Sequence, residues 1–220
     1  MTVPNMSRLS LILLPKKNRE VLRIVARTLG PGARLSGGTA LMLQIRHRRS
    51  YDLDFFFPKS LSVTHLERKL MDTLGRDLRL LYTSSDQINM EWQDIRISLI
   101  SFPFPPLTKI HHLGNINITD LRDIASEKVY AIGRREEWRD YADLYAILKN
   151  GIITLKQVIK DCEKRFGNGF SSRLLLNQLS AVDKIEIQKL DWLKKTPESK
   201  EIFQFFKKVV KDYLQEHCQV

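Results

Sequence analysis

The most informative segment of this chain reads LSGGTALMLQIRHRRSYDLDFF and runs from Leu35 to Phe56. Near its start stands the glycine pair Gly37-Gly38, directly before an apolar stretch at residues 39–45. That stretch predicts a short helix buried against a sheet. A run rich in aromatic residues follows at 52–57 and ends before a proline, so it predicts a strand.

The predicted strand carries two aspartates at alternate positions. Alternation sends Asp52 and Asp54 to one face and Leu53 and Phe55 to the other, where the strand packs into a core. Two carboxylates converging on one point suit a hard cation such as Mg²⁺ or Mn²⁺, which shares its shell with water and substrate phosphates. Upstream, the glycine pair lets a phosphate approach the positive end of the following helix. Together these features predict metal-assisted phosphoryl chemistry on a nucleotide.

The composition indicates a folded protein of a reducing compartment. The chain has 220 residues, 43% of them hydrophobic, enough for one large domain or two small ones. Cys162 and Cys218 have no paired-ligand spacing and are too few for a disulfide framework, which favours the cytoplasm. The apolar run at 9–14 is too short to span a bilayer and lacks the features of a secretory signal, so we expect no membrane association.

The positive charge is concentrated near the N-terminus. Of a net charge of +11, the first 60 residues contribute 11 Lys or Arg against three Asp or Glu. The densest cluster, Arg46-His47-Arg48-Arg49, stands just before the two aspartates. A basic field beside an acidic pair suits a polyanion brought to bound metal. A solvated basic surface without a partner is the alternative.

The hydrophobic pattern predicts an α+β fold, with an α/β core over residues 1–105 and an all-helical half over 106–220. Between residues 103 and 115, prolines and the pair His111-His112 interrupt the hydrophobic periodicity and mark the boundary between the two halves. The two histidines are expected to be polar surface. The core is expected to contain helices at 18–29, capped by Asn18, and at 62–74, a short strand at 33–35, and an antiparallel meander at 78–83, 87–92 and 95–102. The expected helices of the second half span about 119–132, 137–149, 154–166, 171–180 and 199–215.

A lysine stands on the apolar face of the predicted helix at 119–132. Lys128 shares this face with leucine and isoleucine, so it either reaches out to solvent or meets an anion. The next helix carries Asp140 and Asp143 at the edges of its apolar seam. Each aspartate is a candidate ion-pair partner for Lys128 or Arg139.

Several of these positions together resemble a known family, the nucleotidyltransferase toxins of the AbiEii/AbiGii abortive-infection type, within the DNA polymerase β-like nucleotidyltransferase superfamily. The resemblance covers about residues 20–150. It rests on Leu35-Ser36-Gly37-Gly38-Thr39-Ala40-Leu41, His47-Arg48, Ser50, Asp52-Leu53-Asp54-Phe55-Phe56, Lys128-Val129-Tyr130-Ala131, Arg134, Arg139-Asp140 and Asp143-Leu144. It implies a polymerase β-like core, a mixed sheet flanked by helices, with the helical half closing the cleft.

The resemblance also implies roles for individual residues. Gly37 and Gly38 correspond to the glycine signature against the triphosphate, and Asp52 and Asp54 to the metal-binding acids. Lys128 corresponds to the helix lysine that contacts the nucleotide phosphates, and Asp143 to the acid of the last motif. The implied nucleotide-binding set further includes Ser36, Thr39, Arg48 and Ser50.

Members of this family act as toxins paired with an antitoxin, and characterised examples transfer a nucleotide from an NTP to an RNA acceptor such as the tRNA 3′ end. For this chain we therefore expect an NTP substrate, an antitoxin partner, and an RNA acceptor on the basic surface near Arg46, Arg48 and Arg49. His47 in this cluster either contacts the nucleotide or acceptor or has no such role. A catalytically silent nucleotide- or RNA-binding module, and transfer to a protein or small molecule, are the alternatives.

One position departs from the superfamily pattern. A third carboxylate is common on a later strand, and at the corresponding place in residues 95–101 this chain has Ser98. A serine cannot replace a carboxylate as general base or charged metal ligand, and Asp94 stands too early along the chain. Three readings follow: metal and geometry activate the acceptor hydroxyl alone, Asp143 serves as the base, or activity is weak or lost.

Overall fold

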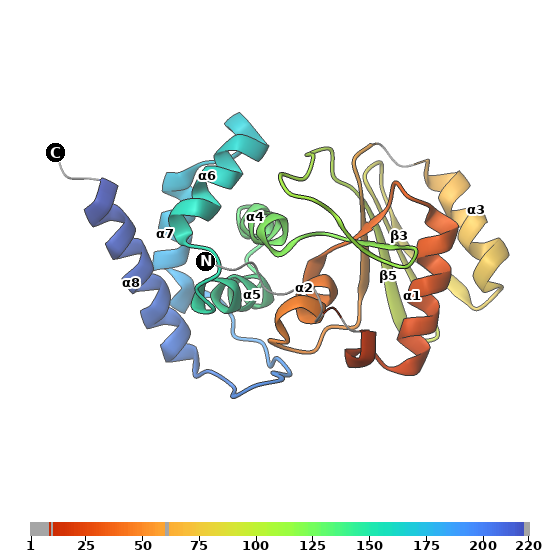
Figure 1. Ribbon diagram of the computed structural model, residues 1–220, viewed down its shortest axis with the longest axis horizontal. Helices are drawn as coiled ribbons and strands as arrows, with labels where there is room; N and C mark the ends of the chain where they lie inside the picture. Colours follow the sequence, from red (N-terminus) through yellow and green to blue (C-terminus); the bar gives the residue numbers. More distant parts are fainter. Residues whose placement is uncertain (1–8, 10, 60–61, 218–220) are drawn as a thin grey trace. The chain divides into compact units, whose positions relative to one another are not determined.

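The computed structural model describes residues 9, 11–59 and 62–217 (Figure 1). Contacts divide these residues into two compact units. The sheet unit contains the described residues up to Gln44 and those from Ser50 to Asp120, and the helical unit contains Ile45–Arg49 and the described residues from Leu121 onward. We predicted a domain boundary after residue 105. This position lies inside the sheet unit, which extends to Asp120.

The sheet unit is built on a mixed seven-stranded sheet in the order β3-β4-β5-β2-β1-β7-β6. Strands β2 and β5 run parallel, as do β1 and β7, and the other neighbouring pairs are antiparallel. The predicted meander β3-β4-β5 is therefore confirmed. The strands are β1 Arg34–Leu35, β2 Leu53–Phe57, β3 Leu78–Thr83, β4 Gln87–Trp92, β5 Ile95–Ser101, β6 His111–Leu113 and β7 Ile116–Ile118.

The predicted alternation is confirmed from Leu53 to Phe55, whereas Asp52, expected as part of the strand, lies before its first residue. Leu53 and Phe55 are completely buried, whereas Asp54 is half-buried on the opposite face. The central strands repeat this pattern, because Ile97 and Leu99 of β5 are buried beside Leu53 and Phe55. Burial of these side chains fixes the register of β2 and so determines which way Asp54 points.

Three helices belong to the sheet unit: α1 Lys16–Leu29, α2 Gly37–Ile45 and α3 Val63–Leu74, and a short 3-10 turn at Leu11–Leu13 precedes α1. Figure 1 shows α1 and α3 side by side over one face of the sheet, where they contact each other. The prediction that Asn18 caps α1 is wrong. The helix begins two residues earlier, after Pro15, and the Asn18 side chain is buried, where its amide donates to the carbonyl of Tyr51.

The sequence did not predict the hairpin β6–β7. Residues 111–118 were expected to be boundary loop and helical half, but they form two strands joined by a tight turn at Gly114, with φ of 61°. The histidine pair lies on β6, where His111 Nε2 is 2.6 Å from Asp120 Oδ2 and His112 Nδ1 is 2.8 Å from Asn117 Oδ1. The hairpin extends the sheet because β7 pairs with β1.

The helical unit confirms the five helices expected after residue 119. They are α4 Leu121–Ile132, α5 Trp138–Lys149, α6 Leu155–Phe166, α7 Ser172–Ser180 and α8 Ser199–His217, with short 3-10 turns at Gly167–Gly169 and Val182–Lys184. Helix α4 packs against α5 and α6, and α8 contacts α5, α6 and α7. Cys162 of α6 is a buried free thiol, and Cys218 lies outside the described residues. Within the described ranges no helix combines the length and apolar character needed to cross a membrane.

Candidate functional site

The glycine pair and the second aspartate meet in the sheet unit. Gly37 opens α2 with a positive φ of 65°, and a Cβ added there would lie 2.5 Å from Asp54 Oδ2. A backbone hydrogen bond of 2.8 Å from the Ser36 amide to the Asp54 carbonyl ties the start of the helix to β2. Only glycine therefore allows the carboxylate to approach the helix N-terminus this closely.

The first aspartate is held through its backbone. Thr39, completely buried on α2, donates its hydroxyl to the carbonyl of Asp52 at 2.6 Å. The Ser50 hydroxyl lies 3.3 Å from the same Thr39 oxygen. Thr39 thus anchors the segment that carries Asp52, while contact of Thr39 or Ser50 with a nucleotide stays a prediction.

Removing this anchor should lower stability measurably. We expect Thr39→Val to reduce the free energy of unfolding by about 1–3 kcal/mol, because the partly buried Asp52 carbonyl loses its hydroxyl donor. Thr39→Ser keeps the hydroxyl and serves as the matched control. Urea unfolding of the three proteins tests this, and equal stability of the Val and Ser variants would contradict it.

The neighbouring strand supplies no third carboxylate. Ser98 of β5 stands opposite Asp54 in the parallel register, at the place where the superfamily pattern expects an acid. Asp94 lies in the tight turn between β4 and β5, with φ of 68°, and cannot fill this place. Within residues 9, 11–59 and 62–217, no three His, Cys, Asp or Glu side chains gather as a ready-made metal site. Two carboxylates alone still fit Mg²⁺, which is commonly held by one or two acids plus substrate phosphates.

The helical unit contains a second ionic cluster, centred on Asp143 of α5. The Asp143 side chain is completely buried, and its Oδ1 accepts from Arg48 Nε at 2.6 Å and lies 2.8 Å from His47 Nε2. Its Oδ2 accepts from Arg48 Nη2 at 2.9 Å and pairs with Lys128 Nζ at 2.6 Å. Three basic side chains therefore surround one carboxylate.

Lys128 does not reach out to solvent. It is buried on α4 and bridges two aspartates, since its ammonium also donates to Asp140 Oδ1 at 2.9 Å. Asp140 in turn accepts from Arg135 Nε at 2.9 Å. Of the alternatives left open by the sequence, Lys128 therefore meets anions, namely both candidate aspartates, whereas Arg139 pairs with Glu137.

Burial and neighbouring charges shift the ionisation of this cluster. Burial alone raises the pKa of Asp143, but Lys128 and Arg48 outweigh it and hold that pKa well below its ordinary value. Burial lowers the pKa of His47 below 6.5 despite the facing carboxylate. Burial also disfavours the charged form of Lys128, yet Asp143 and Asp140 keep the pKa of Lys128 raised. A carboxylate so strongly held in its charged form is a poor proton acceptor, which argues against Asp143 as general base.

These shifts predict how stability depends on pH. Folded His47 binds its proton more weakly than unfolded His47, so stability should fall as the pH drops below 6.5. Because the pKa of Asp143 is depressed in the folded protein, stability should fall further as the pH drops below 3.8. Because the pKa of Lys128 is raised, this residue should reduce stability only as the pH rises above 10.5. Measured by urea unfolding, the free energy of unfolding should be lower at pH 5 than at pH 8, and this difference should be smaller in His47→Gln than in the wild type. An equal decrease in both proteins would contradict this.

The basic cluster at 46–49 is not the continuous exposed surface that the sequence suggested. Arg48 is buried against Asp143, and Arg49 pairs with Asp191 at 2.8 Å, whereas Arg46 is exposed. The backbone explains this, because residues 47–49 pair with 191–193 through an antiparallel bridge between Arg48 and Trp192. Of the three arginines expected to bind RNA, one is therefore used inside the helical unit.

The structure thus divides the predicted site residues between the two units. It brings Gly37, Thr39, Ser50 and the two aspartates of the sheet unit into one neighbourhood through the contacts described above. In the helical unit it brings together Lys128, Asp143 and Arg48, with Asp140 as the second partner of Lys128. It also places two residues in roles that no sequence pattern indicated, His47 as a partner of Asp143 and Arg135 as a partner of Asp140.

Comparisons with known proteins place the chain in a family. The model of the family described as nucleotidyl transferase AbiEii toxin, type IV toxin–antitoxin system, matches residues 20–212. A protein of Aquifex aeolicus (strain VF5), aq_aa25, described as uncharacterized, is 30% identical over 207 residues, covering 92% of this chain and 98% of that protein.

Two solved structures share the fold. A putative nucleotidyltransferase from Helicobacter pylori superposes with a TM-score of 0.53 at 17% identity, covering 91% of this chain and 94% of the other. MenT4, a nucleotidyltransferase toxin from Mycobacterium tuberculosis H37Rv, gives a TM-score of 0.50 at 15% identity, covering 89% and 82%. These matches confirm the predicted polymerase β-like fold class. The family model matches most of the length of this chain. The chain therefore belongs to the AbiEii nucleotidyl transferase toxin family of type IV toxin–antitoxin systems.

Proposed function

We propose that this chain transfers a nucleotide from an NTP to an RNA acceptor, in a reaction that depends on a divalent cation. Family membership supports nucleotidyl transfer. The observation that carries the finer proposal is the approach of Asp54 to Gly37 at the N-terminus of α2. A phosphate bound by the first amides of that helix would lie beside a carboxylate that prefers hard cations.

Each group of the sheet unit has a defined task in this proposal. The backbone amides at Gly37 and Gly38 bind phosphate oxygens, as the exposed N–H groups of a helix N-terminus do. Thr39 orients the segment that carries Asp52, and the core packing of β2 orients Asp54. Asp52 and Asp54 would hold Mg²⁺ or Mn²⁺, which when bound neutralises phosphate charge.

The remaining polar groups hold charge rather than move protons. Lys128 keeps its positive charge through Asp140 and Asp143 inside the helical unit, and its contact with the phosphates stays a prediction. Ser98 leaves β5 without a base, so attack by the acceptor hydroxyl would depend on alignment with the α-phosphorus and on charge neutralisation. Pyrophosphate would be the leaving group, and the proton of the acceptor hydroxyl would pass to solvent water.

Family membership also supports a proposed partner and a proposed compartment. Type IV toxin–antitoxin membership supports an antitoxin protein as partner and the cytoplasm, where NTP and RNA are available, as the place of action. The net charge of +11 supports a polyanionic acceptor. We propose RNA rather than protein on this basis.

A second candidate is supported by Ser98. Because the strand beside Asp54 offers a hydroxyl in place of a carboxylate, the protein would in this alternative bind nucleotide and RNA without catalysing transfer.

Incubation with each α-labelled NTP, Mg²⁺ and total RNA separates the candidates. The proposal predicts label in the RNA fraction, and none when EDTA replaces Mg²⁺. Label that appears in protein or in small molecules would contradict the RNA acceptor. Nucleotide binding without any transfer would establish the silent module instead.

A further inference from the structure

The face of the sheet that carries Asp54 continues beyond the site across three further strands. Asp54 of β2 stands opposite Ser98 of β5. Ser98 stands in turn opposite Asn89 of β4, and Asn89 opposite Tyr82 of β3. Residues that stand opposite each other in neighbouring strands share a face of the sheet. This row therefore leads from the proposed cation site to the edge strand β3, over three spacings between strands of about 4.8 Å each.

The two faces of these strands differ in burial. Four residues of the face opposite to Asp54 are at most 1% exposed: Ile88, Met90, Ile97 and Leu99. Helices α1 and α3 cover that face, because the Trp92 indole nitrogen donates to the Leu74 carbonyl at 2.9 Å and Lys17 Nζ lies 5.5 Å from the centre of the Trp92 ring (Figure 1). The face of the row is open to a ligand, since Tyr82 is 53% exposed and Asn89 is half-buried.

A register shift in β3 places Tyr82 on the open face. The pairing of β3 with β4 shifts by one residue just before Tyr82, so Leu81 is an extra residue and Tyr82 stands opposite Asn89. Without this shift, Tyr82 would stand opposite Ile88 and turn to the buried face. Bulges of this kind commonly re-aim a side chain next to an active site. The backbone of β3 thus directs an aromatic ring to the same face as Asp54.

The groups beside this row can hydrogen-bond a base and attract a phosphate. Asn89 Oδ1 accepts from Gln87 Nε2 at 2.8 Å, which orients the amide, and the Asn89 nitrogen can donate to a ligand. Two residues along the strands, Arg96 of β5 and Arg79 of β3 stand on either side of Glu91. Arg79 pairs with Glu91, and Arg96 is exposed. Two cations against one acid favour a phosphate at this part of the face.

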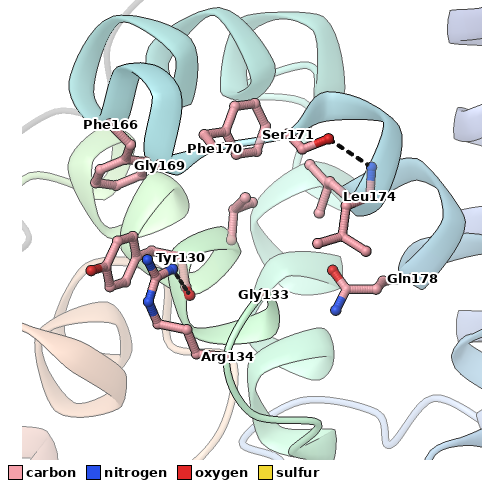
Figure 2. A pocket seen from close by; sticks show the side chains of 11 residues that line it. Tyr130, Gly133, Arg134, Phe166, Gly169, Phe170, Ser171, Leu174 and Gln178 are labelled. Atoms are coloured by element: carbon pink, nitrogen blue, oxygen red, sulfur yellow. Dashed lines mark hydrogen bonds between the residues drawn. The ribbon is translucent and has the colours of Figure 1, made fainter.

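A hollow in the helical unit is too small for the same ligand. Figure 2 shows this hollow, which Tyr130 and Arg134 line together with residues between Phe166 and Gln178. Its volume is about 50 Å³, whereas small-molecule sites have roughly 300–1,000 Å³. The Arg134 guanidinium already lies over the Tyr130 ring and donates to the Tyr130 carbonyl at 3.2 Å. Of these two places, the sheet face is the one that can hold a residue of RNA.

We propose that this face binds the unpaired 3′ end of the RNA acceptor, an inference that rests on the proposed transfer to RNA. We call it the acceptor face and define it by Ser98, Asn89, Tyr82 and Arg96. The terminal ribose would lie over Ser98, whose small side chain leaves room for the attacking hydroxyl beside Asp54. A base further along the RNA would stack on Tyr82 and accept from Asn89, with a phosphate near Arg96. Aromatic rings on an open sheet hold single-stranded RNA in this way in other folds.

Fluorescence anisotropy with a 5′-labelled single-stranded oligoribonucleotide, in EDTA, tests the acceptor face apart from the reaction. Tyr82→Ala should weaken binding at least about fivefold, the lower end for losing a base–aromatic stack. Tyr82→Phe keeps the ring and should bind like the wild type. Leu80→Ala is the matched control, because it removes an exposed side chain of the same strand that stands opposite Met90, on the other face. It should also bind like the wild type.

Two further variants and a second ligand test the expected contacts. Arg96→Gln should weaken binding and reduce its dependence on salt, because one phosphate contact is lost. Arg68→Gln, on the exposed side of α3, is the matched control and should change neither. A fully paired duplex of the same sequence has no base free to stack on a side chain, so its binding should be insensitive to Tyr82→Ala.

The outcomes separate this inference from the proposed function. If transfer is observed, Tyr82→Ala should raise the KM for RNA and leave the KM for NTP unchanged, and an unchanged KM for RNA would overturn the acceptor face while transfer stands. If transfer is never observed, loss of single-stranded RNA binding in Tyr82→Ala still supports the acceptor face. Equal RNA binding by Tyr82→Ala and the wild type overturns it. A dimer in light scattering that both Tyr82→Ala and Leu80→Ala dissociate would also overturn it, because the face would then join two copies of the chain.

Discussion

Asp143→Asn is expected to lower the free energy of unfolding by about 3–5 kcal/mol, the usual effect of removing one partner from a buried ionic cluster. The amide would leave Arg48 without its bidentate carboxylate and Lys128 with Asp140 alone. Neither cation can turn to water, because both side chains are 8% exposed or less. Urea unfolding followed by circular dichroism measures the loss directly.

Two comparisons make this result specific. Asp212→Asn breaks an exposed pair with Lys208 and should leave the unfolding free energy unchanged within error. Removing both charges together, in Arg48→Met with Asp143→Leu, should be less destabilising than Asp143→Asn alone, because Arg48 is no longer a buried charge without its partner, while Lys128 keeps Asp140 in both variants. Wild-type stability of Asp143→Asn would show that the cluster does not hold the helical unit together.

Gly37→Ala is expected to reduce nucleotide transfer at least about 100-fold, the scale of misplacing a catalytic group by about an ångström. The added Cβ would lie 2.5 Å from Asp54 Oδ2, so the carboxylate must move away from the start of α2. Alanine at a φ of 65° also strains the backbone, by roughly 1–2 kcal/mol. Initial rates of label transfer and thermal unfolding together separate the two effects.

Gly75→Ala provides the matched control. Gly75 also has a positive φ, 79°, but a Cβ there meets nothing within 4 Å. This variant should show a similar loss of stability with full transfer activity. Equal activity of Gly37→Ala and Gly75→Ala would mean that the approach of Asp54 to Gly37 is not needed for the reaction.

Local sequence patterns predicted most elements of the fold, because the spacing of apolar residues in a segment reflects which face of the helix or strand is buried. The alternation Leu53-Asp54-Phe55 and the periodicity of the five late helices translate directly into the observed structure. The hairpin at 111–118 was missed although Gly114-Asn115 between alternating residues is itself a hairpin signal. The nearby prolines instead indicated a domain boundary. In addition, β7 pairs with β1, which is far away in the sequence, so no local pattern indicates this pairing.

The candidate site was predictable where its parts are close in sequence. The glycine pair and the two aspartates fall within one segment, and the Asp54–Ser98 register follows from the core positions of both strands. The contacts of His47 and Arg48 with Asp143 span 96 and 95 residues and leave no local signal. The run of basic residues at 46–49 therefore suggested an RNA-binding surface. In the structure, Arg48 of this run is instead buried as the counterion of Asp143.

Transfer of α-labelled nucleotide to RNA by the wild type and by Asp54→Asn, at equal concentration with Mg²⁺, tests the central claim most directly. The substitution keeps the size of the side chain and removes the charge that would hold the cation, and β2 stays fixed by Leu53 and Phe55. We predict labelled RNA with the wild type and at least about 1,000-fold less with Asp54→Asn, in the range of losing a major electrostatic contribution to catalysis. Equal labelling by the two folded proteins would contradict the account.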